Sequence, residues 1–212
     1  MKEIKIPEAT IARLSVYSRF LTRMEKNGVE TVSSVEIARG IAGNSAQVRK
    51  DFAYFGGFGK RGVGYNVVDL NKNIKDILGL NKEWKAVIVG MGNLGSALAH
   101  YHGFSARGFT ITGMFDNDPK KIGTDLNNIQ IMKEDELEKF LDENEVDILI
   151  LTIPAEYAQD LVDRVIDKGI KGILNFTPAV IYAGEHIQIR NVDLAVNLEI
   201  LSYNLRGKKN RK

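Results

Sequence analysis

The chain has 212 residues, 44% hydrophobic and 26% charged, which is typical of globular proteins with one large or two smaller domains. It contains no cysteine, which excludes disulfides, thiolate nucleophiles and cysteine-based zinc sites. No apolar run approaches the roughly 20 residues of a membrane span, and the first residues lack the apolar core of a signal peptide. We therefore expect a cytoplasmic protein that does not bind membranes. Basic side chains are in excess in residues 1–80 and acidic ones in residues 81–205, which favours a polyanionic partner for the first segment, although a solvated basic face would give the same pattern.

The first 80 residues predict a bundle of short helices. A helix is expected from Pro7 to Asn27, because apolar residues recur at three- and four-residue spacing between them. Ser33 and Glu36 have the spacing of a capping box, which opens a second helix ending near residue 41, and Asn44 and Gln47 repeat this spacing. A third helix is expected from there to residue 55, with Phe52 and Phe55 as core anchors, and a fourth over residues 67–78.

Two short helices joined by a glycine-containing turn are typical of a helix-turn-helix, whose second helix lies in the major groove of DNA. Glutamine there suits adenine, arginine suits guanine, and lysine suits phosphate or guanine. The glycine-rich segment 56–65 predicts a hairpin or wing that presents its basic tip to a minor groove or to phosphates. The alternative is a helical hairpin with a flexible loop that binds no nucleic acid. The candidate DNA-binding residues are Ser45, Gln47, Arg49, Lys50, Lys60, Arg61, Gly62 and Tyr65.

Residues 85–95 predict a strand that ends in the glycine pattern GxGxxG and is followed by a helix. In a dinucleotide-binding turn, Gly90 permits the tight turn, Gly92 lets the backbone approach a pyrophosphate, and Gly95 lets the helix pack on the strand. Asp116 follows about 20 residues later, at the end of a second strand, where its carboxylate can accept hydrogen bonds from ribose hydroxyls. Because no arginine stands next to it to neutralise a 2′-phosphate, we expect NAD rather than NADP. The alternative is a glycine-rich turn that binds nothing.

The rest of the chain alternates between strands and helices. Strands are predicted over residues 128–132, 147–153 and 171–175, and helices over residues 134–143 and 156–168. This alternation indicates a doubly wound parallel sheet. Ligands in such sheets lie at the carboxyl ends of strands, so further pocket walls are expected from Thr152, Ile153, Pro154, Asn175, Phe176, Thr177 and Pro178.

The last segment, residues 191–206, predicts a helix with four leucines along one side. These leucines, at positions 194, 198, 201 and 205, could pack on the protein's own sheet or on a second subunit, and their spacing favours neither.

Catalysis is not expected. The three histidines, His100, His102 and His186, have no carboxylate at a spacing typical of a proton-transfer pair, and no cluster of metal ligands is found in the sequence.

These motifs together resemble the redox-sensing transcriptional repressor Rex of bacteria. The resemblance rests on the segments 47–51, 54–65, 89–96 and 172–178 and extends from about Pro7 to about Tyr203. It implies a homodimer that binds a palindromic operator, represses genes of fermentative and respiratory metabolism, and releases DNA when NADH binds. It also implies that the C-terminal helix is exchanged between subunits and lies between the partner's two domains.

The resemblance also implies roles for individual residues. A tyrosine near the nicotinamide falls on Tyr101, and an arginine and an aspartate that exchange partners as the ligand binds fall on Arg19 and Asp193. The phosphate loop falls on Gly90, Met91, Gly92, Asn93, Leu94 and Gly95, and the ribose-binding acid on Asp116.

We therefore predict a winged helix-turn-helix domain in residues 1–80, a Rossmann-like NAD(H)-binding domain in residues 81–190, and a dimerisation helix with a basic tail in residues 191–212. The alternatives are an NAD-dependent oxidoreductase with a helical appendage and a coenzyme A binding module.

Overall fold

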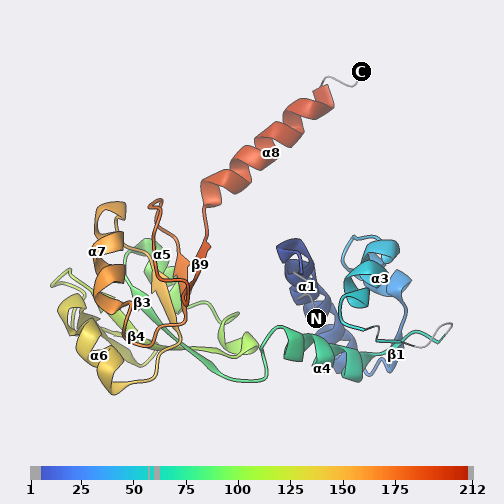
Figure 1. Ribbon diagram of the computed structural model, residues 1–212, viewed down its shortest axis with the longest axis horizontal. Coiled ribbons are helices and arrows are strands. Elements are labelled where there is room, and N and C mark those ends of the chain that lie inside the picture. The colour runs from blue at the N-terminus through green and yellow to red at the C-terminus, as the bar shows by residue number, and fades with distance from the viewer. Residues whose placement is uncertain (1–5, 57, 60–62, 210–212) are drawn as a thin grey trace. The chain divides into compact units, whose positions relative to one another are not determined.

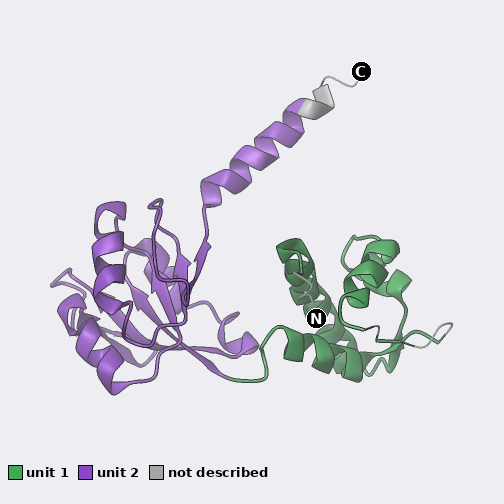
Figure 2. Ribbon diagram, in the orientation of Figure 1, with its two compact units in different colours: residues 1–82 green, residues 83–212 purple. Residues whose placement is uncertain are grey.

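The computed structural model describes residues 6–56, 58–59 and 63–209. Contacts within the chain divide it into two compact units, Met1–Lys82 and Glu83–Lys212 (Figure 2). Each unit has a hydrophobic core of its own. Among the described residues, no helix is long and apolar enough to cross a membrane.

The described part of unit 1 is a helical bundle with a small antiparallel sheet (Figure 1). Leu14, Tyr17 and Leu21 lie on one side of the first helix and are at most 1% exposed, as their three- and four-residue spacing predicts. They pack against Phe52 of the third helix and Ile74 of the fourth. The elements are α1 (Glu8–Lys26), β1 (Thr31–Val32), α2 (Ser34–Gly40), α3 (Ser45–Ala53), β2 (Tyr65–Asn66) and α4 (Val67–Ile77).

The glycine-rich segment 56–65, predicted as a hairpin or wing, ends in a strand that pairs outside the segment. The strand at its end, β2, pairs with β1, more than 30 residues earlier in the chain, in the register Thr31 to Asn66 and Val32 to Tyr65. Gly64 permits this pairing, because its φ is +93° and an added Cβ would lie 2.8 Å from the carbonyl oxygen of Val32. The predicted tip residues Lys60, Arg61 and Gly62 lie outside the described residues.

One of the two predicted capping boxes is confirmed and the other is wrong. The Ser33 amide donates to Glu36 Oε2 over 2.8 Å, and the Glu36 amide donates to Ser33 Oγ over 3.1 Å. Asn44 does cap α3, but it accepts from the Ala46 amide over 2.7 Å. The side chain of Gln47 points forward along the helix instead of back to the cap, because a buried carboxylate one turn further on attracts its amide group.

Unit 2 is built on a seven-stranded sheet in the order β5-β6-β4-β3-β7-β8-β9, in which only the β5–β6 pair is antiparallel. The predicted strands are present; β5 and β9 are additions that the sequence pattern did not indicate. The strands are β3 (Trp84–Val89), β4 (Phe109–Asp116), β5 (Asp125–Leu126), β6 (Ile129–Lys133), β7 (Ile148–Leu151), β8 (Gly172–Asn175) and β9 (Gln188–Asn191). The helices that connect them are α5 (Asn93–Ala99), α6 (Leu137–Glu143) and α7 (Ala155–Val165), with 3₁₀ turns at Ser105–Arg107 and Glu134–Glu136.

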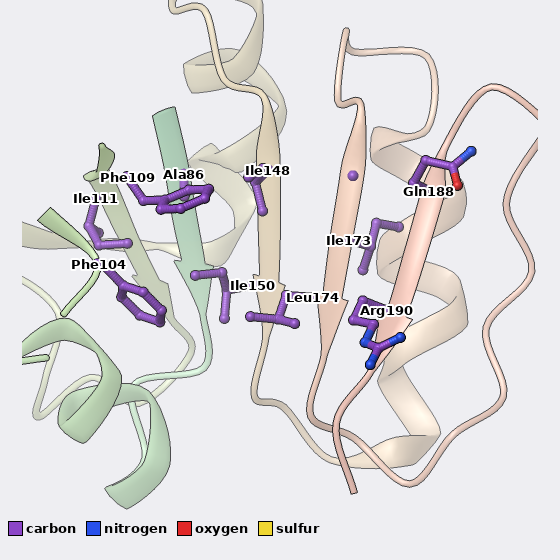
Figure 3. A pocket seen from close by; sticks show the side chains of 11 residues that line it. Ala86, Phe104, Phe109, Ile111, Ile148, Ile150, Ile173, Leu174, Gln188 and Arg190 are labelled. Carbon is purple, nitrogen blue, oxygen red and sulfur yellow. The ribbon is translucent and has the colours of Figure 1, made fainter. Parts of the chain in front are cut away.

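The two faces of the sheet are covered unequally. Val87, Val89 and Leu149 face a core that includes α6 and α7, whereas Ala86 and Ile88 face the core on which α5 packs. On that second face, side chains from β3, β4, β7, β8 and β9, together with Phe104, line a groove of about 410 Å³. Figure 3 shows them along neighbouring strands, and they are mostly apolar: Ala86, Phe104, Phe109, Ile111, Ile148, Ile150, Ile173, Leu174, Gln188 and Arg190.

The last helix, α8 (Leu194–Lys209), is exposed on all sides from Leu194 to Arg206. It follows β9 directly, and Asp193 caps it by accepting from the amides of Ala195 and Val196, over 2.8 and 3.4 Å. Every residue from Leu194 to Arg206 is exposed, so in the single chain the leucine seam does not pack on its own sheet. At 3.6 residues per turn the apolar side chains form two seams on opposite sides of the helix, one of Leu194, Leu198, Leu201 and Leu205, and the other of Val196, Ile200 and Tyr203.

Candidate nucleotide and DNA sites

The glycine turn between β3 and α5 has the geometry of a tight strand-to-helix connection. Gly90 follows the last residue of β3 with a φ of +95°, and an added Cβ would lie 2.6 Å from the carbonyl oxygen of Thr152. Gly95 lies inside α5, where an added Cβ would lie 1.9 Å from the Gly90 carbonyl oxygen. These two positions require glycine for the fold itself, because any side chain would separate α5 and β7 from the turn.

Gly92 differs from its two neighbours in the motif. Its backbone has ordinary angles, with φ at −70°, and an added Cβ would meet no atom within 4 Å. The protein alone gives no reason for glycine here. Open space beside a backbone at the start of a helix is what a phosphate group needs for close approach, so the ligand role of Gly92 stays a prediction that this geometry supports.

Asp116 lies at the end of β4, beside this turn. Its Oδ2 accepts from the Met91 amide over 2.6 Å, and its Oδ1 accepts from the Asp118 amide over 2.7 Å. Burial alone would raise the pKa of this carboxyl, but the hydrogen bonds from the Asp118 amide, Lys121 and the Met91 amide together hold the pKa below its usual range. Asp116 is therefore a fixed, ionised acceptor.

Lys121 is the residue that the sequence reasoning missed. Its Nζ lies 3.0 Å from Asp116 Oδ2 and 3.9 Å from Asp118 Oδ2. No arginine is adjacent to Asp116 in the sequence, but the polar turn up to Gly123 brings this lysine back onto it. A cation therefore does stand beside the expected ribose site.

A cavity of about 530 Å³ joins the glycine turn to Asp116. Thr152 and Pro154 line it, as the sequence predicts for residues after a parallel strand, and Thr152 Oγ1 donates to the Gly90 carbonyl oxygen over 2.6 Å. Glu134 was not expected; it accepts from Asn117 Nδ2 over 2.7 Å and from Arg164 Nη1 over 2.8 Å. The lining residues are Val89, Gly90, Gly92, Asp116, Asn117, Lys121, Glu134, Thr152, Ile153, Pro154 and Tyr157.

Several expected pocket residues lie elsewhere. Asn175 is fully buried, and its amide group donates to the Ala179 carbonyl oxygen and to Asn191 Oδ1, while its oxygen accepts from the amide and hydroxyl of Thr177. The following loop and Asn191 of β9 use all the hydrogen-bonding capacity of this side chain, so it shapes the chain rather than contacting a ligand. The other members of that segment, Phe176, Thr177 and Pro178, are likewise not among the residues that line this cavity.

The rest of the predicted phosphate loop and the three predicted switch residues differ in how far they are exposed. Met91 is 2% exposed and contributes its amide, and Asn93 and Leu94 lie at the start of α5 with exposed side chains. Tyr101 is 55% exposed, packs edge-on against Phe104, and lines a different hollow from the one that contains Asp116. Arg19 in unit 1 and Asp193 in unit 2 are both exposed.

The DNA-reading candidates lie at the start of α3. Arg49 and Lys50 are exposed, and Arg49 Nη1 donates to Ser34 Oγ of α2 over 3.0 Å. Ser45 is the first residue of the helix and is half-buried. Phe52 is a core anchor, as expected, at 2% exposure. Tyr65, expected on the DNA side, packs its ring edge-on against Phe52, with centroids 5.2 Å apart, which indicates a packing role.

Among the described residues, no group of three or more acidic or histidine side chains is arranged to hold a metal ion.

Comparisons with known proteins cover both units. Residues 5–53 match the family model described as a putative DNA-binding protein N-terminus, and residues 81–179 match the CoA binding domain model. The redox-sensing transcriptional repressor Rex of Desulfitobacterium hafniense is 54% identical over 97% of this chain and 98% of its own length. Rex of Carboxydothermus hydrogenoformans is 55% identical over 97% and 99%.

Comparison with solved structures points to the same family. RSP in complex with β-NAD+ and operator DNA superposes with a TM-score of 0.90 and 38% identity, covering 98% of this chain and 95% of that one. RSP in complex with β-NADH gives a TM-score of 0.85 and 36% identity, covering 98% and 97%. With identities above 50% over nearly the whole length, the chain belongs to the family of redox-sensing transcriptional repressors called Rex.

Proposed function

We propose that this chain is a cytoplasmic transcriptional repressor that binds operator DNA through α2 and α3 and releases it when NADH occupies the cavity beside Asp116. It is a DNA-binding regulator rather than an oxidoreductase, because the family to which it belongs consists of transcriptional repressors. The RSP structures contain β-NAD+ with operator DNA and β-NADH, so both nucleotides are assigned to this chain as ligands.

The observation that carries the nucleotide assignment is the contrast between the three glycines. Gly90 and Gly95 are packed against protein, whereas Gly92 leaves open space in the same cavity as the Asp116 carboxylate. The backbone at Gly92 would hold the pyrophosphate, and Asp116 would accept from ribose hydroxyls. Since Asp116 already accepts three hydrogen bonds and a carboxylate has about four acceptor sites, one site is left for the ribose unless Lys121 gives way.

The response to redox state follows from differential affinity, because a ligand shifts a two-state protein only by the difference in its affinity for the two states. The neutral dihydronicotinamide loses less hydration free energy in an apolar, closed site than the cationic ring of NAD+ does. We therefore propose that NADH favours a closed form whose two recognition helices no longer match half-sites one DNA turn apart.

We further propose that the active form is a homodimer in which α8 is exchanged between subunits and lies between the partner's two domains. Two observations support it: α8 is exposed from Leu194 to Arg206, and it has apolar seams on opposite sides, as a helix covered from two directions needs. The groove across β4, β3, β7, β8 and β9 is a mostly apolar surface available to such a helix.

Leu198→Asp tests the dimer, with Asn204→Asp as the matched control on the same helix. Leu198 is 68% exposed in the single chain, so the aspartate causes no clash there. We expect sedimentation to give monomers for Leu198→Asp and dimers for the wild type and the control. A dimer for all three contradicts the proposed role of α8.

Tyr101, Arg19 and Asp193 are proposed as switch residues on the family resemblance. Tyr101→Phe and Asp193→Ala are expected to bind operator DNA and to need more NADH for release. If both variants release DNA at the same NADH concentration as the wild type, these residues only pack at an interface and have no role in switching.

The decisive experiment for the function is fluorescence anisotropy of a labelled duplex, selected from a random-sequence library with the full-length chain, at a stated salt concentration. NADH is expected to release the duplex at a far lower concentration than NAD+. Binding that responds to neither nucleotide contradicts the proposed function, and consumption of NADH with a carbonyl substrate would favour the oxidoreductase alternative.

A further inference from the structure

A single buried carboxylate connects α1 to the recognition helix α3. Asp51 is 0% exposed and accepts five hydrogen bonds. Its Oδ2 accepts from Arg13 Nε over 2.6 Å and from Tyr17 Oη over 2.7 Å. Its Oδ1 accepts from Arg13 Nη2 over 2.7 Å, from Gln47 Nε2 over 2.8 Å and from Thr10 Oγ1 over 3.2 Å. Four of these bonds come from Thr10, Arg13 and Tyr17 of α1, and the bond from Gln47 comes from α3 itself.

The ionisation of Asp51 fixes what Gln47 can do. Burial by itself raises the pKa of Asp51, but the hydrogen bonds from Arg13, Tyr17 and Gln47 hold it below its ordinary value. An ionised carboxylate accepts hydrogen bonds and donates none. The nitrogen of the Gln47 amide group must therefore face Asp51, and the flipped arrangement, oxygen against oxygen, is excluded.

The other side of the Gln47 amide group is left for a ligand. Gln47 is the third residue of α3 and is half-buried. Its Oε1 accepts no hydrogen bond from the described residues and is reachable by solvent. One acceptor and the second Nε2 hydrogen are thus presented side by side, which is the pair that recognises the N6 donor and N7 acceptor of adenine in the major groove.

We propose that Asp51 is a specificity-determining positioning residue: it fixes the amide of Gln47 in the one orientation that selects adenine. This inference rests on the proposed function, in which α3 enters the major groove. If Asp51 held only α1 to α3, its loss would weaken binding to all sequences alike. If it orients Gln47, its loss changes the preference at one base pair of each half-site.

Asp51→Asn separates these two roles, because the asparagine amide can donate to Gln47 Oε1 and so permits the flipped orientation. Two donors then face outward, a pattern that suits the O6 and N7 acceptors of guanine. The experiment selects duplexes from a random-sequence library with the full-length wild type, Asp51→Asn, Gln47→Ala and the double variant, and compares base preference position by position. Tyr17→Phe is the matched control, because it removes a hydrogen bond to Oδ2 of the same carboxylate and leaves Gln47 on Oδ1.

We expect Gln47→Ala to lose the preference for adenine at one position by about tenfold, the range of a bidentate contact. Asp51→Asn should relax the same position to a similar degree, and the double variant should relax it no further. Tyr17→Phe should keep the wild-type preference even where it lowers stability.

Three outcomes overturn the inference. Asp51→Asn could keep every preference that Gln47→Ala loses, Gln47→Ala could relax no position, or Tyr17→Phe could relax the same position as Asp51→Asn. A wild type that selects no sequence would instead overturn the proposed function, and this inference with it.

A measurement on the wild type keeps the test independent of whether Asp51→Asn folds. In ¹⁵N-resolved NMR spectra of the full chain without DNA, the two Nε2 hydrogens of Gln47 resonate separately, as in any primary amide, and the one bonded to Asp51 should exchange with solvent markedly more slowly than the other. Equally fast exchange of both hydrogens with solvent would mean that Asp51 does not hold the amide, and would overturn the inference without any variant.

Discussion

Gly92→Ala is the substitution that best separates fold from ligand binding in the glycine turn. The methyl group would meet no atom within 4 Å, and the φ of −70° suits alanine. Alanine is a poorer N-cap than glycine, by up to about 1 kcal/mol, but it lowers the entropy of the unfolded chain, which offsets about 0.4–1 kcal/mol. The free energy of unfolding should therefore change by less than about 1 kcal/mol.

The effect on NADH should be much larger. A methyl group in the open space would hold a pyrophosphate away from the backbone amides, and a hydrogen bond to a charged group contributes about 1.5–3 kcal/mol. Losing one such bond lowers NADH affinity by about 10- to 100-fold. Titration calorimetry with NADH measures the affinity, and thermal unfolding measures the stability of the same sample.

Gly169→Ala is the matched control for this experiment. Gly169 has a φ of +83° and lies in the turn after α7, away from the cavity. Alanine there should cost about 1–2 kcal/mol of stability and leave NADH affinity unchanged. If Gly92→Ala binds NADH as tightly as the wild type, the assignment of the open space to the pyrophosphate is refuted.

Three further predictions concern charge and capping. The pKa of Asp51 is lowered in the folded state, so the stability it contributes is complete above the unfolded pKa of about 3.9 and is lost as the pH falls below that value. The free energy of unfolding, measured with urea, should therefore fall more steeply below pH ~4 for the wild type than for Asp51→Asn. Lys121→Met removes the one cation that lines the cavity in the described structure, and calorimetry should find NADPH disfavoured against NADH by about a further tenfold. Ser33→Ala breaks the capping box of α2 and should cost about 1 kcal/mol in urea unfolding, with recovery in Ser33→Asp; no loss in the alanine variant would contradict the role of the cap.

The features that the sequence predicted well depend on neighbours close in the chain. The turn at Gly90 follows from a strand, a glycine pattern and a helix within about a dozen residues, and the capping box at Ser33 depends on residues three apart. The parallel sheet around β3 follows from the alternation of strands and helices along the chain. In each case the local pattern and the final fold require the same residues.

The features that were missed depend on contacts between distant segments or on competition between partners. The pairing of β1 with β2 joins two strands of two residues each, too short to show alternation. Gln47 has the spacing of a capping-box residue, whose side chain would accept from the backbone amide of Asn44. Its amide group instead donates to the buried carboxylate of Asp51, because a hydrogen bond to an ionised acceptor is the stronger of the two. Asn175 ends a strand as a ligand-binding residue would, but its side chain is occupied by three hydrogen bonds with the following loop and one to Asn191 of β9.

The exposed apolar seams of α8 have a consequence for how much repressor a cell contains. In the proposed dimer both seams are covered, whereas an unpaired chain holds them in water, where chaperones and proteases recognise such segments. The rate of pairing rises with the square of the protomer concentration, while the rate at which unpaired chains are degraded rises with its first power. The amount of functional repressor should therefore rise more steeply than the rate of its synthesis, which gives expression of this gene a threshold.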